Sequence, residues 1–139
     1  PQGGDLPIWV GGGSAAALKR AGAAGDGWLG SAAMGDAERV SGMIATVKQA
    51  AEEAGRDPAA LGFQTQLSPP PRDDDPSARS FYANPHEVAA VAAAAKAAGF
   101  DWATINVTGV FLAGARSIDA MIDSLQALHD RLREEVGSD

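Results

Sequence analysis

The sequence predicts an α/β protein that is built from four successive strand–helix units. Short apolar stretches alternate along the chain with longer segments whose apolar residues recur at helical spacing. Gly25, Gly55 and Gly99 each follow one of these longer segments, and glycine commonly ends a helix. Because strands and helices alternate, we expect a parallel sheet with right-handed crossovers.

The first unit begins with a strand over residues 8–10. A glycine turn follows, and Ser14, a residue type favoured at the N-cap, starts a helix that ends at Gly25. The apolar stretch over residues 27–30 then predicts the second strand.

Asp36 caps the helix of the second unit, which ends at Gly55. Four apolar residues of this helix fall at helical spacing and form one face. They are Val40, Met43, Ile44 and Val47. A single helical turn from Asp57 to Leu61 leads into the third strand, in which residues 63–67 alternate between apolar and polar.

Residues 68–84 form an unusually long connection within the single domain that we expect for residues 1–139. Its run of prolines and aspartates excludes a regular element, so the connection is either a flexible lid or a solvated insertion. Asn84 and Pro85 then begin a helix, with cap and first residue in the favoured order, and this helix ends at Gly99.

The fourth strand is predicted over residues 102–107, and Ser117 caps a last helix that extends to about Val136. This helix carries an apolar stripe. Its members are Ile118, Met121, Ile122, Leu125, Leu128 and Leu132. A weak internal repeat relates residues 24–28 to residues 98–102, since in both a helix stops at glycine before an aromatic-bearing strand. The four units fit either a complete small parallel sheet or half of an eightfold βα barrel.

Two pairs of polar residues are predicted on strand faces. Alternation places Asn106 and Thr108 on the same face of the fourth strand as Thr104. A polar row on a central strand must meet a ligand, water or an internal hydrogen-bond network, so Asn106 and Thr108 are candidate site-lining residues. Gln64 and Gln66 on the third strand raise the same question.

The strongest candidate site is the turn made by Gly11, Gly12, Gly13 and Ser14. Glycine lets the backbone approach a ligand closely, and the first N–H groups of a helix have no partners within it. Together with the helix dipole, these groups favour a phosphate or a carboxylate. A glycine-rich turn without any ligand is the alternative.

Composition excludes several classes of function. Eighteen acidic residues against eleven basic ones give a net charge of −7, which argues against nucleic acid and anionic membrane surfaces as partners. The lack of cysteine excludes disulfides and thiolate metal sites. No apolar run reaches the length of a membrane span, so we expect a cytoplasmic protein.

The two histidines do not indicate a site. His86 and His129 are isolated, with no carboxylates at metal-binding spacing, so no metal is expected. The segment from Gly12 to Ala16 has some likeness to the nucleophile elbow of hydrolases. That chemistry needs a suitably placed acid and histidine, and a histidine midway along the last helix does not supply one.

Five segments of the chain carry a resemblance to a known family, namely residues 6–14, 17–21, 25–28, 113–117 and 129–133. They resemble the luciferase-like monooxygenase family, and especially its branch that uses the deazaflavin coenzyme F-420. The family folds as a (β/α)8 barrel, and this chain is similar to its C-terminal half. The resemblance implies an oxidoreductase or monooxygenase that uses F-420 or FMN for hydride transfer to, or oxygenation of, a small organic substrate.

The resemblance also implies roles for particular residues. The backbone around Gly12, Gly13 and Ser14 would hold the cofactor phosphate, and Ser31 would lie near the substrate at the rim of the barrel. Met34 stands where a sugar-phosphate dehydrogenase branch has a lysine, which argues against a sugar phosphate as substrate. Most of the residues that would surround the flavin ring belong to the N-terminal half of the family and have no counterpart here.

Two hypotheses of different classes therefore remain. In the first, the chain is part of an enzyme whose other half comes from a lost segment, a separate chain or a second copy. In the second, it is a non-catalytic half-barrel, either a truncated relic that self-associates or a module that binds phosphate-bearing ligands. Because Pro1 stands in place of a methionine, we expect a processed, trimmed or incomplete chain.

Association is expected under both hypotheses. Open sheet edges favour pairing, and four aromatic residues beside the strands are expected to add exposed apolar area. They are Trp9, Trp28, Phe63 and Trp102. The sequence thus predicts a homo-oligomer or a complex with the missing half.

Overall fold

The computed structural model describes residues 6–30, 37–69, 73 and 80–137. Four parallel strands form one sheet, and their order in the sheet follows their order in the chain. They are β1 (Trp9–Gly11), β2 (Gly27–Gly30), β3 (Gly62–Gln66) and β4 (Trp102–Thr104). This arrangement confirms the predicted α/β fold of four consecutive βα units, like those of half a (β/α)8 barrel.

Helices connect the strands and continue beyond the last one. They are α1 (Ala15–Ala24), α2 (Ala37–Glu53), the short 3-10 turns η1 (Pro58–Ala60) and η2 (Phe81–Ala83), α3 (Pro85–Ala98), α4 (Val107–Leu112) and α5 (Ile118–Val136). The predicted caps are confirmed for three helices, since Ser14, Asn84 and Ser117 accept hydrogen bonds from N–H groups of the first turn. The predicted cap Asp36 lies outside the described residues.

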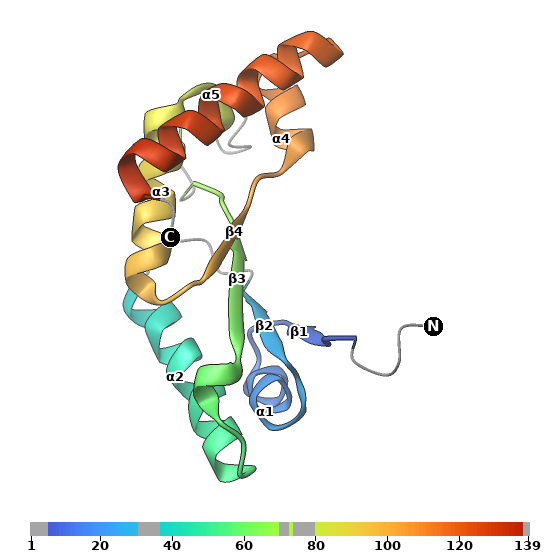
Figure 1. Ribbon diagram of the computed structural model, residues 1–139, viewed down its shortest axis with the longest axis vertical. Helices are drawn as coiled ribbons and strands as arrows, with labels where there is room; N and C mark the ends of the chain where they lie inside the picture. The colour runs from blue at the N-terminus through green and yellow to red at the C-terminus, as the bar shows by residue number, and fades with distance from the viewer. Residues whose placement is uncertain (1–5, 31–36, 70–72, 74–79, 138–139) are drawn as a thin grey trace.

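The helices pack in the same order as the strands, with α1 on α2, α2 on α3 and α3 on α5. In Figure 1, α2, α3 and α5 lie along one side of the sheet. The core fills the space between this helix layer and the sheet, where Trp28 of β2 stacks on Phe100 with ring centroids 5.9 Å apart. Within the part of the chain that the structure describes, no helix is long and apolar enough to cross a membrane.

The four aromatic residues beside the strands do not share one face, so the prediction that all four are exposed is wrong for two. Trp28 and Phe63 face the helices and are 0% and 3% exposed. Trp9 and Trp102 lie on the opposite face of the sheet, and Trp102 is 65% exposed. Alternation along each strand explains the division, because neighbouring residues point to opposite faces.

The indole of Trp9 lies across the open face of the sheet, over two glycines that are aligned with it. Gly27 and Gly62 are in register with Trp9 on β2 and β3, and a Cβ at either glycine would overlap with the indole ring. The absence of side chains at these two positions therefore makes room for Trp9. The indole covers the N-terminal end of the open face.

The predicted fourth strand is too long by three residues. β4 ends at Thr104, and Asn106 instead caps the short helix α4, with its Oδ1 atom accepting hydrogen bonds from the N–H groups of Thr108 (3.0 Å) and Gly109 (3.4 Å). An asparagine side chain that satisfies the first N–H groups of a helix favours the helical path over an extended one. The prediction that Asn106 and Thr108 continue the polar row of the strand is therefore wrong.

The weak internal repeat corresponds to two similar joints between strands. Asp26 donates its N–H to Ile8 O and accepts the Ile8 N–H at Oδ2, at 2.7 Å in both cases. Asp101 forms the same pair of hydrogen bonds with Phe63, both at 2.9 Å. At each joint an aspartate fixes the start of a strand against its neighbour.

The apolar stripe of α5 is only partly covered. Leu128 is buried against the core, whereas Ile118 and Ile122 at the start of the helix are 78% and 59% exposed. The stripe was predicted from helical spacing, which does not show how many of its residues find a partner in this chain.

Candidate functional site

A hollow of about 410 Å³ lies at the C-terminal ends of the strands. Its lining comes from all four strands, the turn after β1 and the residues that follow β3. The lining residues are Gly11, Gly12, Leu29, Gly30, Gln64, Thr65, Gln66, Ser68 and Thr104. Parallel α/β proteins bind their ligands at this end of the sheet, so the hollow is the candidate site.

The predicted anion turn forms one wall of the hollow. Gly12 has a φ of +108°, a conformation that favours glycine. Its carbonyl oxygen accepts a hydrogen bond from the indole Nε1–H of the buried Trp28 at 2.9 Å. Because C=O and N–H point in opposite directions across a trans peptide, the N–H of Gly13 is directed away from that indole.

The start of α1 leaves backbone donors available. Ser14 O accepts the N–H of Leu18, and Ser14 Oγ accepts the N–H of Ala17 at 3.3 Å. The N–H groups of residues 13–16 have no acceptor among the residues that the structure describes. Together with the helix dipole, these N–H groups suit a phosphate or carboxylate.

Polar and apolar residues form two rows across the open face of the sheet. Leu29, Gln64 and Trp102 are in register on β2, β3 and β4, and so form one row. Gln66 and Thr104 form a second row nearer the C-terminal end, where Thr104 Oγ1 donates to the carbonyl oxygen of Thr65 at 3.3 Å. The two glutamines that the sequence indicated thus face the hollow.

The other predicted site residues have different positions. Asn106 is the N-cap of α4 and Thr108 lies in the first turn of that helix, so neither lines the hollow. Ser31 and Met34 lie outside the described residues. Sequence reasoning did not identify Leu29 or Ser68 as lining residues, because their neighbours in the hollow come from distant parts of the chain.

Tyr82 was also missed, although it fixes two segments near the hollow. Its hydroxyl donates to the carbonyl oxygen of Leu67 at 2.6 Å and accepts the N–H of Asn106 at 2.9 Å. Gly109 of α4 lies so close to the phenol ring that a Cβ there would overlap with it. Burial raises the pKa of Tyr82 above its ordinary value of 10.0, and the hydrogen bond with Asn106 opposes part of this rise.

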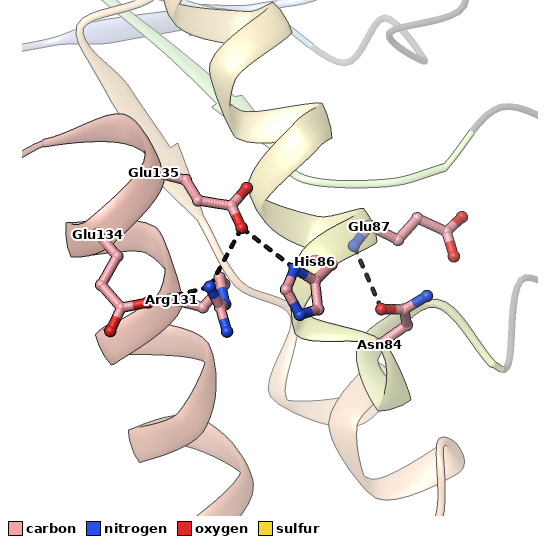
Figure 2. A network of polar contacts seen from close by, with 6 residues as sticks. All are labelled: Asn84, His86, Glu87, Arg131, Glu134 and Glu135. Carbon is pink, nitrogen blue, oxygen red and sulfur yellow. Dashed lines mark hydrogen bonds and ion pairs between the residues drawn. The ribbon is translucent and has the colours of Figure 1, made fainter.

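The histidines lie on helices and away from the hollow. Figure 2 shows His86 of α3 beside α5, with Nδ1 3.2 Å from Oε1 of Glu135. The same carboxylate lies 3.4 Å from Nη1 of Arg131, which also contacts Glu134 at 3.0 Å. His129 contacts its neighbour Asp130 on α5.

Four residues of these ion pairs line a groove of about 270 Å³ between α3 and α5, namely His86, Asp130, Arg131 and Glu134. Exposed pairs of this kind contribute little to stability. Within the described residues, no group of three or more histidines, aspartates or glutamates is placed to hold a metal ion.

The fold and the hollow define a βα-repeat protein with a candidate ligand site at the C-terminal ends of its strands. Residues 1–132 match the family model for luciferase-like monooxygenases, and the chain belongs to this family of oxidoreductases. The resemblance that the sequence motifs predicted is thereby confirmed. The comparison with curated protein sequences gave no match.

Among solved structures, the chain is similar to the coenzyme F-420-dependent tetrahydromethanopterin reductase from Methanopyrus kandleri. The two are 19% identical, with a TM-score of 0.45. The alignment covers 94% of this chain and 44% of the reductase chain, so this chain spans less than half the length of that protein.

Proposed function

We propose that the chain forms the C-terminal half of a flavin- or deazaflavin-dependent oxidoreductase and holds the phosphate of FMN or coenzyme F-420 on residues 11–14. Membership of the luciferase-like family supports the class of reaction. The observation that carries the location is the row of N–H groups at the start of α1, beside the hollow, for which the described residues provide no acceptor. When bound, such a cofactor supplies hydride transfer or oxygen activation toward a small organic substrate.

The described residues of the chain bind and position ligands in this proposal. The backbone of Gly13 and Ser14 binds the phosphate, and the open face of the sheet receives the rest of the cofactor. No residue that lines the hollow in the described part of the chain is titratable. Groups that transfer protons during the reaction therefore come from outside this set, and we assign them to the other half of the barrel.

The other half is a partner in this proposal. β1 and β4 are the two edges of the sheet, and the apolar residues on its open face need cover. A preceding segment, a separate chain or a second copy supplies the four strands that complete a barrel of eight.

A comparison of FMN with riboflavin tests the phosphate site, because the two differ only in that group. We expect FMN to bind more tightly, with an advantage that falls as salt is added. Gly13→Asp places a carboxylate at the turn, where a Cβ meets only the flexible end of Met43, and is expected to remove the advantage. Gly42→Asp is the matched control, since Gly42 on α2 has open space around it.

Equal affinity of the wild-type protein for FMN and riboflavin would contradict the phosphate site. The same conclusion follows if Gly13→Asp and Gly42→Asp behave alike. The absorbance of F-420 reports on its binding in the same way. The cofactor that binds more tightly identifies the branch of the luciferase-like family.

A non-catalytic binding module is the second candidate function. The uncharged lining of the hollow, within the described residues, favours it. The two candidates differ in turnover: when supplied with reduced cofactor and the completing half, the enzyme oxidises the cofactor in a substrate-dependent way, and the module does not.

A further inference from the structure

We infer that Gln64 recognises the edge of a flat, uncharged ligand group that carries adjacent C=O and N–H groups, such as an imide or a lactam. This inference rests on the proposed function only for the position of the ligand in the hollow. It adds the chemical class of the group that lies on the open face of the sheet and the residue that selects it.

The first argument for this role is the position of Gln64. The residue lies in the middle of β3, is half-buried and faces the hollow. Its side-chain amide has no hydrogen bond to any of the residues that the structure describes. By contrast, the hydroxyl of Thr104 in the next row donates to a carbonyl oxygen. The amide therefore faces the open hollow, and a ligand that pairs with its oxygen and its N–H groups would take the place of water there.

The second argument is the lack of charge in the described lining of the hollow. Among the described residues, none that lines the hollow is charged, so an anionic group at the depth of Gln64 would have no counter-charge. The donors that suit an anion lie instead at the turn around Gly13. A ligand with an anionic end and an uncharged end would therefore place the uncharged end against Gln64.

The third argument is the shape of the surface around Gln64 and the hydrogen-bonding pattern of its amide. Leu29 and Trp102 flank Gln64 in register and offer apolar surfaces, which suit a flat group. A primary amide has one accepting oxygen and two donating N–H groups. An imide or lactam edge offers the complementary acceptor and donor side by side, so both halves of the Gln64 amide are paired.

Side-chain amide signals in NMR spectra test this assignment directly. The sequence has five glutamines and two asparagines, and Gln64→Met identifies the Gln64 signal by its loss. Uridine, which carries an imide but no flavin ring, is expected to shift this signal, whereas 3-methyluridine, whose imide N–H is blocked, is not. An unchanged Gln64 signal with uridine, or equal shifts with both probes, would overturn the inference.

Flavin affinities give a second test. If Gln64 pairs with the imide of the flavin ring, Gln64→Met weakens FMN and riboflavin alike, by about tenfold. Gln49→Met is the matched control, because Gln49 lies on the outer surface of α2 and bonds to Glu53. We expect it to bind both flavins like the wild type.

The two proposals fail in different ways. If the wild type binds FMN and Gln64→Met binds it equally tightly, the role of Gln64 is overturned and the proposed function stands. A wild-type protein that binds neither FMN nor F-420 would overturn the proposed function, and the uridine comparison would then decide alone on Gln64.

Discussion

Trp28 and Tyr82 are largely buried residues that each hold backbone at the open end of the sheet. Trp28 bonds to the carbonyl oxygen of Gly12, and Tyr82 joins Leu67 to Asn106. In both residues an aromatic body packs in the core while one polar atom reaches a loop. The shape of the candidate site thus depends on side chains that a ligand would not touch.

Tyr82 is expected to titrate above its ordinary pKa of 10.0. Because the fold favours the neutral phenol, its contribution to stability is fully present below pH 10.0 and is lost as the pH rises through the higher pKa of the folded state. Tyr82 is the only tyrosine, so near-ultraviolet absorbance of tyrosinate reports on it alone.

Tyr82→Phe is the control for this titration. It should abolish the absorbance change and lower the free energy of unfolding by about 1–3 kcal/mol, because Leu67 O and Asn106 N–H lose their partner. A midpoint for the wild type at or below that of free tyrosine would contradict the burial of the Tyr82 phenol.

Trp28→Phe should lower the free energy of unfolding by about 2–3 kcal/mol, because it leaves Gly12 O without its donor and opens space in the core. Urea denaturation measures the change. Trp102→Phe is the matched control and should cost less than about 0.5 kcal/mol, since Trp102 is exposed. Equal costs would show that the indole N–H is not needed.

At the scale of elements, the two aspartate joints explain how short strands stay in register. β1 and β4 have three residues each, and few ladder hydrogen bonds align them. Asp26 and Asp101 add side-chain hydrogen bonds at the start of the pairing. Arg56 contacts the first joint through Asp26, whose Oδ1 lies 3.6 Å from Nη2. Its Nη1 also donates to the carbonyl oxygens of Gly22 and Gly25 at 2.7 and 2.6 Å.

Asp101→Ala should therefore lower the free energy of unfolding by about 1–2 kcal/mol, because the part-buried N–H of Phe63 loses its acceptor. Asp123→Ala on the exposed face of α5 removes the same charge without such a contact and should change stability by less than about 0.5 kcal/mol. Thermal unfolding of both variants at one pH gives the comparison. Similar values would mean that the joint does not stabilise the strand.

The end of β4 shows where sequence patterns become ambiguous. Residues 102–107 alternate as a strand does, yet Asn106 begins α4. The signal for the helix was present, since asparagine is a favoured cap, but β-branched residues on either side of it favoured the strand. By contrast, Ser14, Asn84 and Ser117 were identified correctly because an apolar helical pattern followed each of them.

The candidate site was predicted only where it depends on local sequence. The turn at Gly12 and Gly13 could be recognised because its glycines and the following helix are contiguous. The row of Leu29, Gln64 and Trp102 depends on the register of three strands, which residues far apart in the chain determine. The partner of Trp28 could not be predicted for the same reason.

At the scale of the whole molecule, several large apolar side chains are exposed on parts of the chain other than α1, α2 and α3. In the described ranges they are Leu6, Ile8, Leu29, Trp102, Val107, Phe111, Leu112, Ile118 and Ile122. None of them belongs to α1, α2 or α3. They lie at or near the sheet edges, on its open face, and on α4 and α5, which follow the edge strand β4.

We expect this chain to associate in solution. Light scattering should give a mass above the 14.1 kDa of one chain. The fraction of associated chains should grow with protein concentration. Ile122→Lys should reduce association without lowering stability, because the side chain is 59% exposed. A monodisperse monomer across the concentration range would argue against an interface on these surfaces.

Trp9, Gly27 and Gly62 also constrain the order in which this protein can evolve. A side chain at Gly62 overlaps only with the indole, so Trp9 has to be replaced by a smaller residue before Gly62 can change. Gly27 is constrained further, because a Cβ there would also overlap with the backbone oxygen of Gly62. Once a glycine has gained a side chain, tryptophan cannot return at position 9 until that change is reversed. Descendants of this sequence should therefore keep all three residues or lose the tryptophan first.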